Sequence, residues 1–255
     1  MLTRRLVIGA SFVLGGGGEV GALLVHGFTS TPFEVRYLGE RLAAVGIAAV
    51  GPLLPGHGTT VDELGRTSWR TWAAAVEAEL DALRARCRRV VLAGVSLGAL
   101  LALELASRRG PDVAGVCALA TPLWLDGLGA KVARWTAPGA ALACVRLVPK
   151  LGGSDVADPE VKRANPAYRA IPTRALAELV AVMRATDAAL PTIRVPVLAL
   201  HGAQDHTAPV AGADRLVARV PNARMQLFPR SYHLLAADVE RADVAAAVIA
   251  FIEEL

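Results

Sequence analysis

The chain has 255 residues, enough for one α/β domain with a modest insertion, and its composition of 54% hydrophobic but only 5% aromatic residues predicts a large aliphatic core. The formal net charge is +4, but the arginines are dispersed along predicted helices, which is not typical of a nucleic-acid-binding protein. No apolar run is long enough, without a break, to span a membrane, so stable membrane insertion is not expected.

The cysteines and the first residues bear on the cellular compartment. Cys87, Cys117 and Cys144 are odd in number and far apart, so they indicate neither a disulfide framework nor a metal site. Residues 1–14 faintly resemble a signal peptide, but the glycines at 15–18 replace the expected cleavage site and a strand follows at once. We therefore expect a cytoplasmic protein, and the sequence leaves its oligomeric state open.

Apolar periodicity alternates between strands and helices along the first half of the chain. A helix from Ser68 to about Cys87 has a good N-cap, and its apolar stripe is expected to pack in the core. The full set of expected strands is 11–14, 20–25, 47–50, 89–93 and 113–119, and the expected helices are 33–45, 68–87 and 99–108.

A G-x-S-x-G motif, Gly94 to Gly98, lies where a strand meets a helix. A sharp turn at this junction lifts the Ser96 hydroxyl above the edge of the sheet, and glycine at both flanks removes Cβ atoms that would clash. The Leu97 amide, at the helix N-terminus, would then point toward a developing oxyanion. The motif therefore predicts that Ser96 is a nucleophile.

Residues 122–190 interrupt the alternation, and five prolines after Pro122 punctuate the segment, so we expect several short helices there, of which 173–189 is the clearest. The segment carries more apolar side chains than a solvent loop should, and part of it is expected either to line a pocket or to pack on the domain. These side chains are Leu123, Trp124, Leu125, Leu128, Trp135, Leu142, Val145, Leu147 and Val148. We predict a helical lid at 122–190 on a core domain made of 1–121 and 191–255.

The strand and helix pattern then resumes to the end of the chain. Strands are expected at 195–201 and 224–228, and helices at 209–219 and 239–254. Strands that alternate with helices predict an α/β fold with a mostly parallel central sheet and helices on both faces.

A serine nucleophile needs a base, and five histidines are candidates. His233 lies in a loop after the penultimate element, at the sheet edge where sites form in open α/β sheets, so we predict that it is the base. The reaction rate should then rise with pH as a single group with the ordinary histidine pKa of about 6.5 loses its proton. The other four are expected to brace loops or to point elsewhere: His26, His57, His201 and His206.

The orienting acid is predicted to be Asp205, which follows the strand 195–201 directly. The order Ser96, Asp205, His233 is the nucleophile, acid and base order of α/β-hydrolases. Asp238 is expected to cap the last helix. A second oxyanion donor should come from the loop after an early strand, where Gly27 permits a close approach and the Phe28 amide can point at the site.

These pieces together resemble the α/β-hydrolase superfamily and, within it, the small bacterial carboxylesterases and monoacylglycerol lipases. The matching stretches span most of the chain in the right order; they are Leu24 to Pro32, Leu54 to Gly58, Gly94 to Gly98, His201 to Asp205 and Ser231 to His233. The resemblance implies ester hydrolysis without a cofactor or metal, a lid over an acyl pocket, and an oxyanion hole formed by the amides of Phe28 and Leu97.

We therefore expect a serine hydrolase of carboxylic esters whose substrate is a small ester with an apolar acyl chain. Alternatives on the same fold are a thioesterase, an acyltransferase, an amidase or a carbon–carbon bond hydrolase, and a non-catalytic ligand receptor is a further one. Dehalogenase and epoxide hydrolase chemistry is disfavoured because position 96 is serine rather than aspartate.

Overall fold

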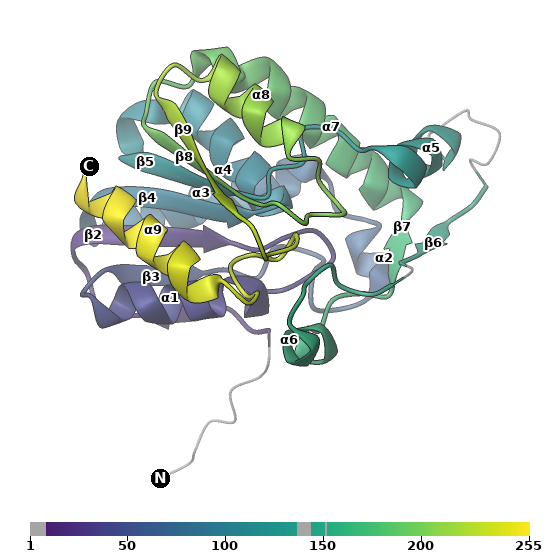
Figure 1. Ribbon diagram of the computed structural model, residues 1–255, viewed down its shortest axis with the longest axis horizontal. Coiled ribbons are helices and arrows are strands. Elements are labelled where there is room, and N and C mark those ends of the chain that lie inside the picture. The colour runs from purple at the N-terminus through teal and green to yellow at the C-terminus, as the bar shows by residue number, and fades with distance from the viewer. Residues whose placement is uncertain (1–8, 137–143, 151) are drawn as a thin grey trace, which may run out of the picture.

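The computed structural model describes residues 9–136, 144–150 and 152–255. Its centre is a seven-stranded sheet in the order β1-β3-β2-β4-β5-β8-β9, and only the edge pair β1–β3 is antiparallel. The fold class predicted from the sequence is therefore confirmed (Figure 1). The strands are β1 (Phe12–Leu14), β2 (Gly18–Val25), β3 (Ala48–Gly51), β4 (Cys87–Val95), β5 (Gly115–Leu119), β8 (Val197–Gly202) and β9 (Ala223–Phe228).

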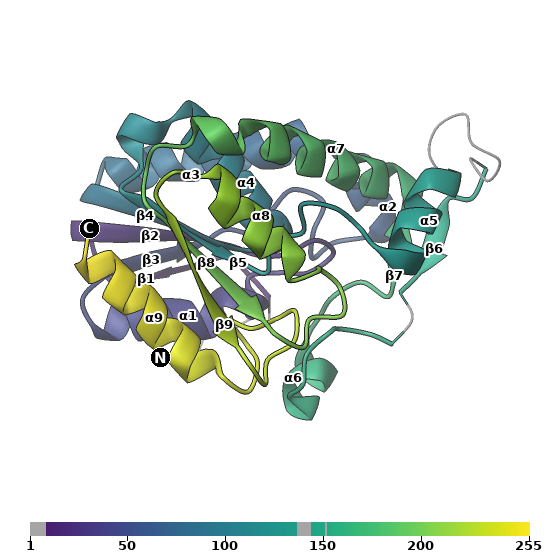
Figure 2. The ribbon, with the colours of Figure 1, turned by 45° about the horizontal axis from the view of Figure 1, so that its top comes forward.

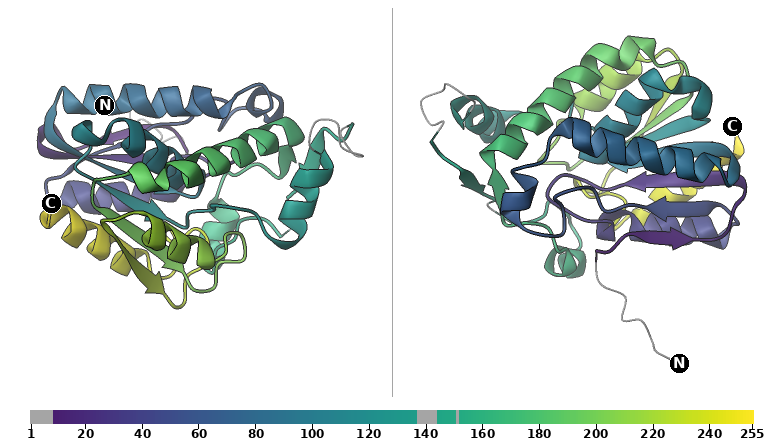
Figure 3. Two further views of the ribbon diagram at one scale, coloured as in Figure 1. Left: turned by 90° about the horizontal axis from the view of Figure 1, so that it is seen from above. Right: turned by 180° about the vertical axis from the view of Figure 1, so that it is seen from behind.

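Two layers of helices cover the sheet, as Figures 1 and 3 show. One face carries α1 (Phe33–Ala44) and α9 (Arg241–Glu253), which share a hydrophobic cluster with that side of the strands. The other face carries α3 (Trp69–Arg84), α4 (Leu97–Arg108), α7 (Thr173–Ala189) and α8 (Ala211–Arg219), which share a second cluster. Short helices lie at α2 (Val61–Leu64), Gly110–Asp112 and Leu190–Thr192.

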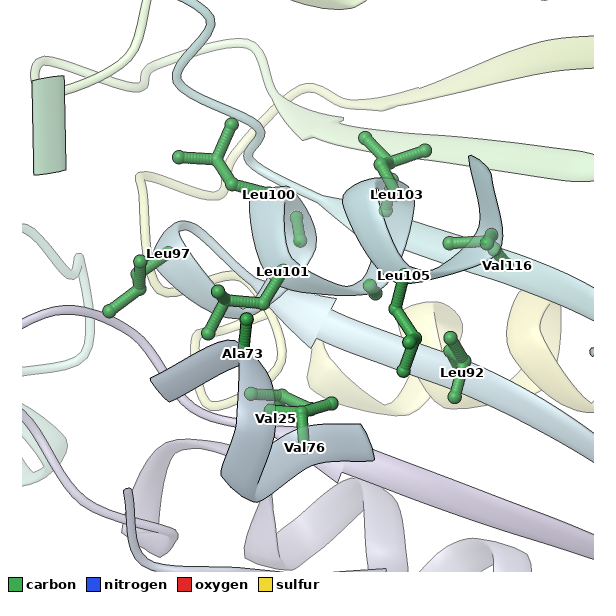
Figure 4. Close-up of a cluster of buried hydrophobic side chains, with 14 of the residues drawn as sticks. Val25, Ala73, Val76, Leu92, Leu97, Leu100, Leu101, Leu103, Leu105 and Val116 are labelled. Carbon is green, nitrogen blue, oxygen red and sulfur yellow. The ribbon is translucent and has the colours of Figure 1, made fainter. Parts of the chain in front are cut away.

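Helix α4 is the best-buried helix among these layers, because every residue from Leu97 to Ala106 is buried. A helix that is apolar on all sides must be enclosed by protein. Figure 4 shows how this is done: Leu101 points toward Ala73 and Val76 of α3, whereas Leu100 points away from them. On that other side the Thr186 hydroxyl of α7 donates to the Leu100 carbonyl at 3.2 Å. The N-terminus of α4, where Ser96 lies, is therefore held rigidly.

The segment between β5 and β8 differs in part from the prediction of short helices alone. It contains α5 (Gly127–Thr136), α6 (Pro159–Ala164) and α7, but also an antiparallel pair of short strands, β6 (Leu147–Pro149) and β7 (Ala170–Pro172). Figure 2 shows α5, β6 and β7 together at one end of the molecule, beyond the carboxyl ends of the sheet strands. Two of the apolar positions named above, Leu142 and the side chain of Leu128, lie outside the described residues.

Among the helices that the structure describes, none combines the length and apolarity that crossing a bilayer requires.

Candidate active site

Ser96 lies in a strained turn between β4 and α4, with φ 56° and ψ −113°. Positive φ is uncommon for a residue with a side chain and recurs at functional sites. Two glycines make the turn possible, because a Cβ on Gly98 would collide with the Val25 carbonyl and one on Gly94 would collide with the backbone of Gly98. The Ser96 amide donates to the Leu119 carbonyl at 2.9 Å, which anchors the turn to β5.

The loop after β2 contains the second predicted oxyanion donor, the amide of Phe28. The Leu54 amide donates to His26 Nε2 at 3.0 Å, so the proton of the neutral imidazole is on Nδ1, which donates to the Gly27 carbonyl at 2.9 Å. The amide of Ser30 points at the same carbonyl, at 3.4 Å. Because the peptide is trans, the Phe28 N–H points the opposite way, and no described residue accepts a hydrogen bond from it.

The two histidines beside this loop remain neutral at physiological pH. Burial, together with the neighbouring His57, lowers the pKa of His26 to about 3, and burial lowers the pKa of His57 to about 4. The His57 ring packs edge-on against Phe28 and Trp72. Neither imidazole is suited to accept a proton near neutrality, and the contacts of His26 agree with the bracing role predicted for it.

Asp205 and His233 form a direct hydrogen bond at the carboxyl edge of the sheet. His233 Nδ1 lies 2.8 Å from Asp205 Oδ2, and the carboxylate side chain is fully buried. The other oxygen, Oδ1, accepts from the amides of Thr207 and Ala208 at 2.8 and 2.7 Å. Because the carboxylate accepts from Nδ1–H, the Nε2 lone pair of His233 is left for a proton from the nucleophile.

The charges of this pair shift both pKa values. Burial opposes ionisation of Asp205, but His233 and the other donors around the carboxylate hold its pKa well below the usual range. Burial also lowers the pKa of His233, yet the charge of Asp205, with smaller contributions from Asp155 and Glu34, more than offsets this and raises it overall. The midpoint of the rise in rate with pH, expected at the ordinary histidine pKa, is therefore expected at higher pH.

Two further residues support this pair in ways that the sequence pattern did not reveal, one by direct contact and one through the loop that carries His233. His201 Nε2 lies 3.2 Å from Asp205 Oδ2 and 3.1 Å from the Ala208 carbonyl, so a second imidazole supports the acid. The prediction that Asp238 caps the last helix is wrong, because the N-cap of α9 is Glu240. Asp238 instead accepts from the amide of Tyr232 at 2.8 Å and from amides of the insertion at about 3 Å, which fixes the loop that carries His233.

Ser96 and His233 line one cavity of about 650 Å³, together with Gly27 and Phe28. No hydrogen bond among the described residues joins the Ser96 hydroxyl to His233, and catalytic hydrogen bonds often shorten only when substrate binds. Aliphatic and Met side chains from the segment between β5 and β8 line part of the cavity: Leu125, Val132, Val148, Val156, Ile171, Leu176, Leu179 and Met183. The structure therefore brings Phe28, Ser96 and His233 to one cavity, and Asp205 reaches it only through its hydrogen bond to His233.

The remaining wall of the cavity is polar and charged. Its polar residues include Thr29, Glu34, Lys150, Ser154, Asp155, His206 and Thr207. Lys150 Nζ lies 3.4 Å from the Thr29 hydroxyl, and burial lowers the pKa of its ammonium group although Glu34 and Asp155 partly oppose the shift. His206 Nδ1 lies 2.9 Å from Asp155 Oδ1, which agrees with the expectation that His206 points away from the acid.

The tryptophans of the insertion do not line this cavity. Trp135 is 44% exposed, and Trp124 packs, partly buried, against the helical core. Within residues 9–136, 144–150 and 152–255, no group of three or more His, Cys, Asp or Glu side chains is arranged to hold a metal ion.

Comparison with known proteins agrees with this geometry. A family model described as "Serine aminopeptidase, S33" matches residues 21–240. A thermostable monoacylglycerol lipase of Bacillus sp. (strain H-257) is 32% identical over 226 residues, which cover 88% of this chain and 86% of the relative.

Solved structures share the fold over nearly the whole chain. A structure from work on two metagenome-derived lipolytic enzymes, LipS and LipT, is 25% identical with a TM-score of 0.89, covering 99% of this chain and 100% of the other. The monoacylglycerol lipase of Paleococcus ferrophilus is 20% identical with a TM-score of 0.77, covering 94% and 96%. The second of these likenesses concerns the fold alone.

Proposed function

The chain belongs to the serine aminopeptidase S33 family of α/β-hydrolases and is a serine hydrolase of the monoacylglycerol lipase and esterase type, and from this premise we propose that Ser96, Asp205 and His233 are its catalytic triad. The amides of Phe28 and Leu97 form the oxyanion hole in this proposal. The observation that carries it is the 2.8 Å contact between Asp205 and His233 at a cavity that Ser96 also lines.

In the first half of the proposed reaction, His233 Nε2 takes the hydroxyl proton as Ser96 Oγ attacks the ester carbonyl carbon. The carbonyl oxygen becomes an oxyanion that accepts from the Phe28 and Leu97 amides. Asp205 stabilises the imidazolium without taking the proton. The alcohol leaves when the imidazolium protonates its oxygen, and an acyl-enzyme remains on Ser96.

In the second half, a water molecule replaces the alcohol. His233 removes a proton from this water as the water oxygen attacks the acyl carbon. The resulting oxyanion uses the same two amides, and its collapse returns the proton to Ser96 Oγ and releases the carboxylic acid. No cofactor is needed in these steps.

The two kinds of wall in the cavity support a substrate with an apolar acyl chain and a small polar alcohol. The apolar wall formed by α5, β6, β7 and α7 suits the acyl chain, and the wall around Lys150 and Asp155 offers hydrogen-bond donors and acceptors to hydroxyl groups. A monoacylglycerol has both parts, and the relative from Bacillus sp. (strain H-257) bears that name. We propose this substrate class.

We also propose that residues 122–190 form a lid on a core of 1–121 and 191–255. The position of α5, β6 and β7 beyond the carboxyl ends of the sheet strands supports this division, whereas α7 packs its inner face in the core cluster. A cytoplasmic location is likewise a proposal, and the buried free thiols of Cys87 and Cys117 suit a reducing compartment.

A substrate panel tests the function directly. Purified enzyme is assayed on p-nitrophenyl esters, monoacylglycerols, matched acyl thioesters and aminoacyl anilides. We expect the highest kcat/KM on monoacylglycerols and esters. A kcat/KM that is highest on thioesters or on anilides would instead support the thioesterase or amidase alternative.

The acyl chain-length profile gives a prediction for the apolar wall. Each buried methylene is worth up to about 0.8 kcal/mol, so kcat/KM should rise several-fold for each two added carbons until the cavity is full. Met183→Trp adds bulk to a side chain that lines the cavity from α7, so its optimum should move to shorter chains. The measurement is kcat/KM for esters from acetate to dodecanoate.

Trp135→Ala is the matched control, because Trp135 is exposed and does not line the cavity. Its chain-length profile should overlay that of the wild type. A flat wild-type profile, or one that Met183→Trp leaves unchanged, would show that the apolar side chains only pack the lid onto the core.

A further inference from the structure

Glu34, in the first turn of α1, is a carboxylate that points into the protein although its position favours a solvated acid. It is only 3% exposed. One oxygen, Oε2, accepts from the Gly27 amide at 3.0 Å, and the other, Oε1, accepts from Asn165 Nδ2 at 3.3 Å. Burying a carboxylate is unfavourable unless it is hydrogen-bonded, so its two partners indicate a defined task.

Asn165 connects this carboxylate to the loop after β2 and to the insertion. Its Oδ1 accepts from the Ser30 hydroxyl at 3.2 Å, and its Nδ2 also donates to the Ser154 hydroxyl at 3.1 Å. Asn165 follows α6 and Ser154 precedes it, so both belong to the segment between β5 and β8. A single polar network therefore joins Glu34, that segment and the loop that contains the Phe28 amide.

The insertion holds the same loop at a second point. Thr29 has a positive φ of 63°, which is unfavourable for a β-branched residue and needs support from its surroundings. Its carbonyl accepts from the Tyr168 amide at 2.8 Å, and its hydroxyl lies 3.4 Å from Lys150 Nζ. Tyr168 in turn bonds through its hydroxyl to the Thr59 amide and the Gly56 carbonyl.

The position of this loop matters because it lies against the nucleophile. A Cβ built on Gly27 would stand 2.8 Å from Glu34 Oε2 and 3.5 Å from Ser96 Cβ. Gly27 is therefore packed between the carboxylate and the serine. A shift of the Gly27 amide also displaces the next peptide unit, whose N–H belongs to Phe28, and misplacement by about 1 Å can lower a rate by about 10²-fold.

We propose that Glu34 is a positioning residue for ester hydrolysis, an inference that rests on the function proposed above. Its buried carboxylate holds Gly27 so that the Phe28 amide faces the oxyanion, and Asn165 makes that placement depend on the insertion. The segment between β5 and β8 thus contributes to turnover as well as to substrate selection.

The carboxylate has a second, separable effect through its charge. His233 bonds to Asp205, and the cavity that it lines carries His206 from the loop after β8, Glu34 from α1, and charged side chains of the insertion: Asp126, Lys150, Asp155 and Lys162. Of these, Glu34 contributes to the raised pKa of His233. A neutral side chain at position 34 stabilises the imidazolium less, so the acid limb of kcat/KM should move to lower pH.

Two variants of Glu34 separate position from charge. Glu34→Ala removes both acceptors, and we expect kcat to fall about 10- to 100-fold with KM changed by less than about threefold. Glu34→Gln keeps an acceptor for the Gly27 amide, so kcat should stay within about threefold while the acid limb of kcat/KM moves to lower pH. Glu40→Gln is the matched control, since Glu40 is an exposed acid on the same helix.

Asn165→Ala provides the test if Glu34→Ala fails to fold, and its kcat should fall about three- to tenfold with little change in thermal midpoint. A Glu34→Ala enzyme within twofold of wild-type kcat, or a Glu34→Gln enzyme that loses as much kcat as Glu34→Ala, overturns the positioning role. The absence of ester turnover in the wild type would contradict the proposed function and this inference with it. If the wild type is active, the kcat values of the variants alone decide whether Glu34 is a positioning residue.

Discussion

Ester turnover is expected to fall about 10⁴-fold or more when Ser96 is replaced by alanine, because no other group at the elbow can form the acyl-enzyme. The fold should persist, since alanine keeps the Cβ and the amide that donates to the Leu119 carbonyl. The measurement is kcat on a p-nitrophenyl ester together with labelling by a fluorophosphonate probe. A variant that keeps a tenth of wild-type turnover would show that Ser96 is not the nucleophile.

Ser96→Gly is the matched control for the strain in the turn. Glycine adopts φ 56° and ψ −113° without a Cβ penalty, so this variant should be equally inactive but more stable than Ser96→Ala by about 1 kcal/mol. Thermal or denaturant unfolding measures the difference. A less stable glycine variant would contradict the view that the turn stores strain for function.

A comparable loss of turnover is expected for His233→Ala, which removes the proton acceptor. In the wild type only neutral His233 can act as base, so kcat/KM should rise with pH. Because the charge of Asp205 raises the pKa of His233, protonation persists to higher pH and the midpoint should lie above about 6.5. Esterase assays between pH 5 and 9 give this midpoint.

An exposed histidine that lines the same cavity supplies the control. His206 is 64% exposed and bonds to Asp155 rather than to Asp205. His206→Ala should therefore keep the acid limb, although substrate contacts in the cavity change. The base assignment is wrong if His206 proves indispensable for the limb while His233 does not.

Local chemistry made the geometry of the elbow predictable, and the proposed acid and base follow from the positions of Asp205 and His233 after strands. A Cβ on Gly94 or Gly98 would clash in the turn, and Asp205 follows a run of apolar residues that is typical of a buried strand. The order of Ser96, Asp205 and His233 along the chain was the other basis for assigning them to one site. Tertiary contacts bring Asp205 and His233 together as that order required.

Three buried polar residues could not be read in the same way. Glu34 in a first helical turn reads as an ordinary solvated acid, and its contact with Gly27 exists only after the loop folds back on α1. His201 ends a strand, where a backbone contact is the simplest interpretation. Asp238 lies just before a helix and reads as a cap, but its carboxylate is engaged by amides brought from elsewhere in the chain.

The short strands β6 and β7 were missed for a related reason. Each has only three residues, and prolines end both of them. Runs this short carry no measurable periodicity, and proline favours an interpretation as a break. Pairing between them depends on the surrounding chain rather than on either stretch alone.

Neighbouring strands β5 and β8 are hydrogen-bonded although residues 120–196 separate them along the chain. The entropy of closing such a long connection grows only logarithmically, so doubling or halving its length changes the free energy by about 0.6 kcal/mol. Folding of the sheet therefore places almost no constraint on the length of the insertion, and substrate range can diverge by exchange of the whole segment. A grafted segment would have to restore the contacts now made by Asn165 and Tyr168, so a chimera that lacks them should fold and bind esters yet turn them over slowly.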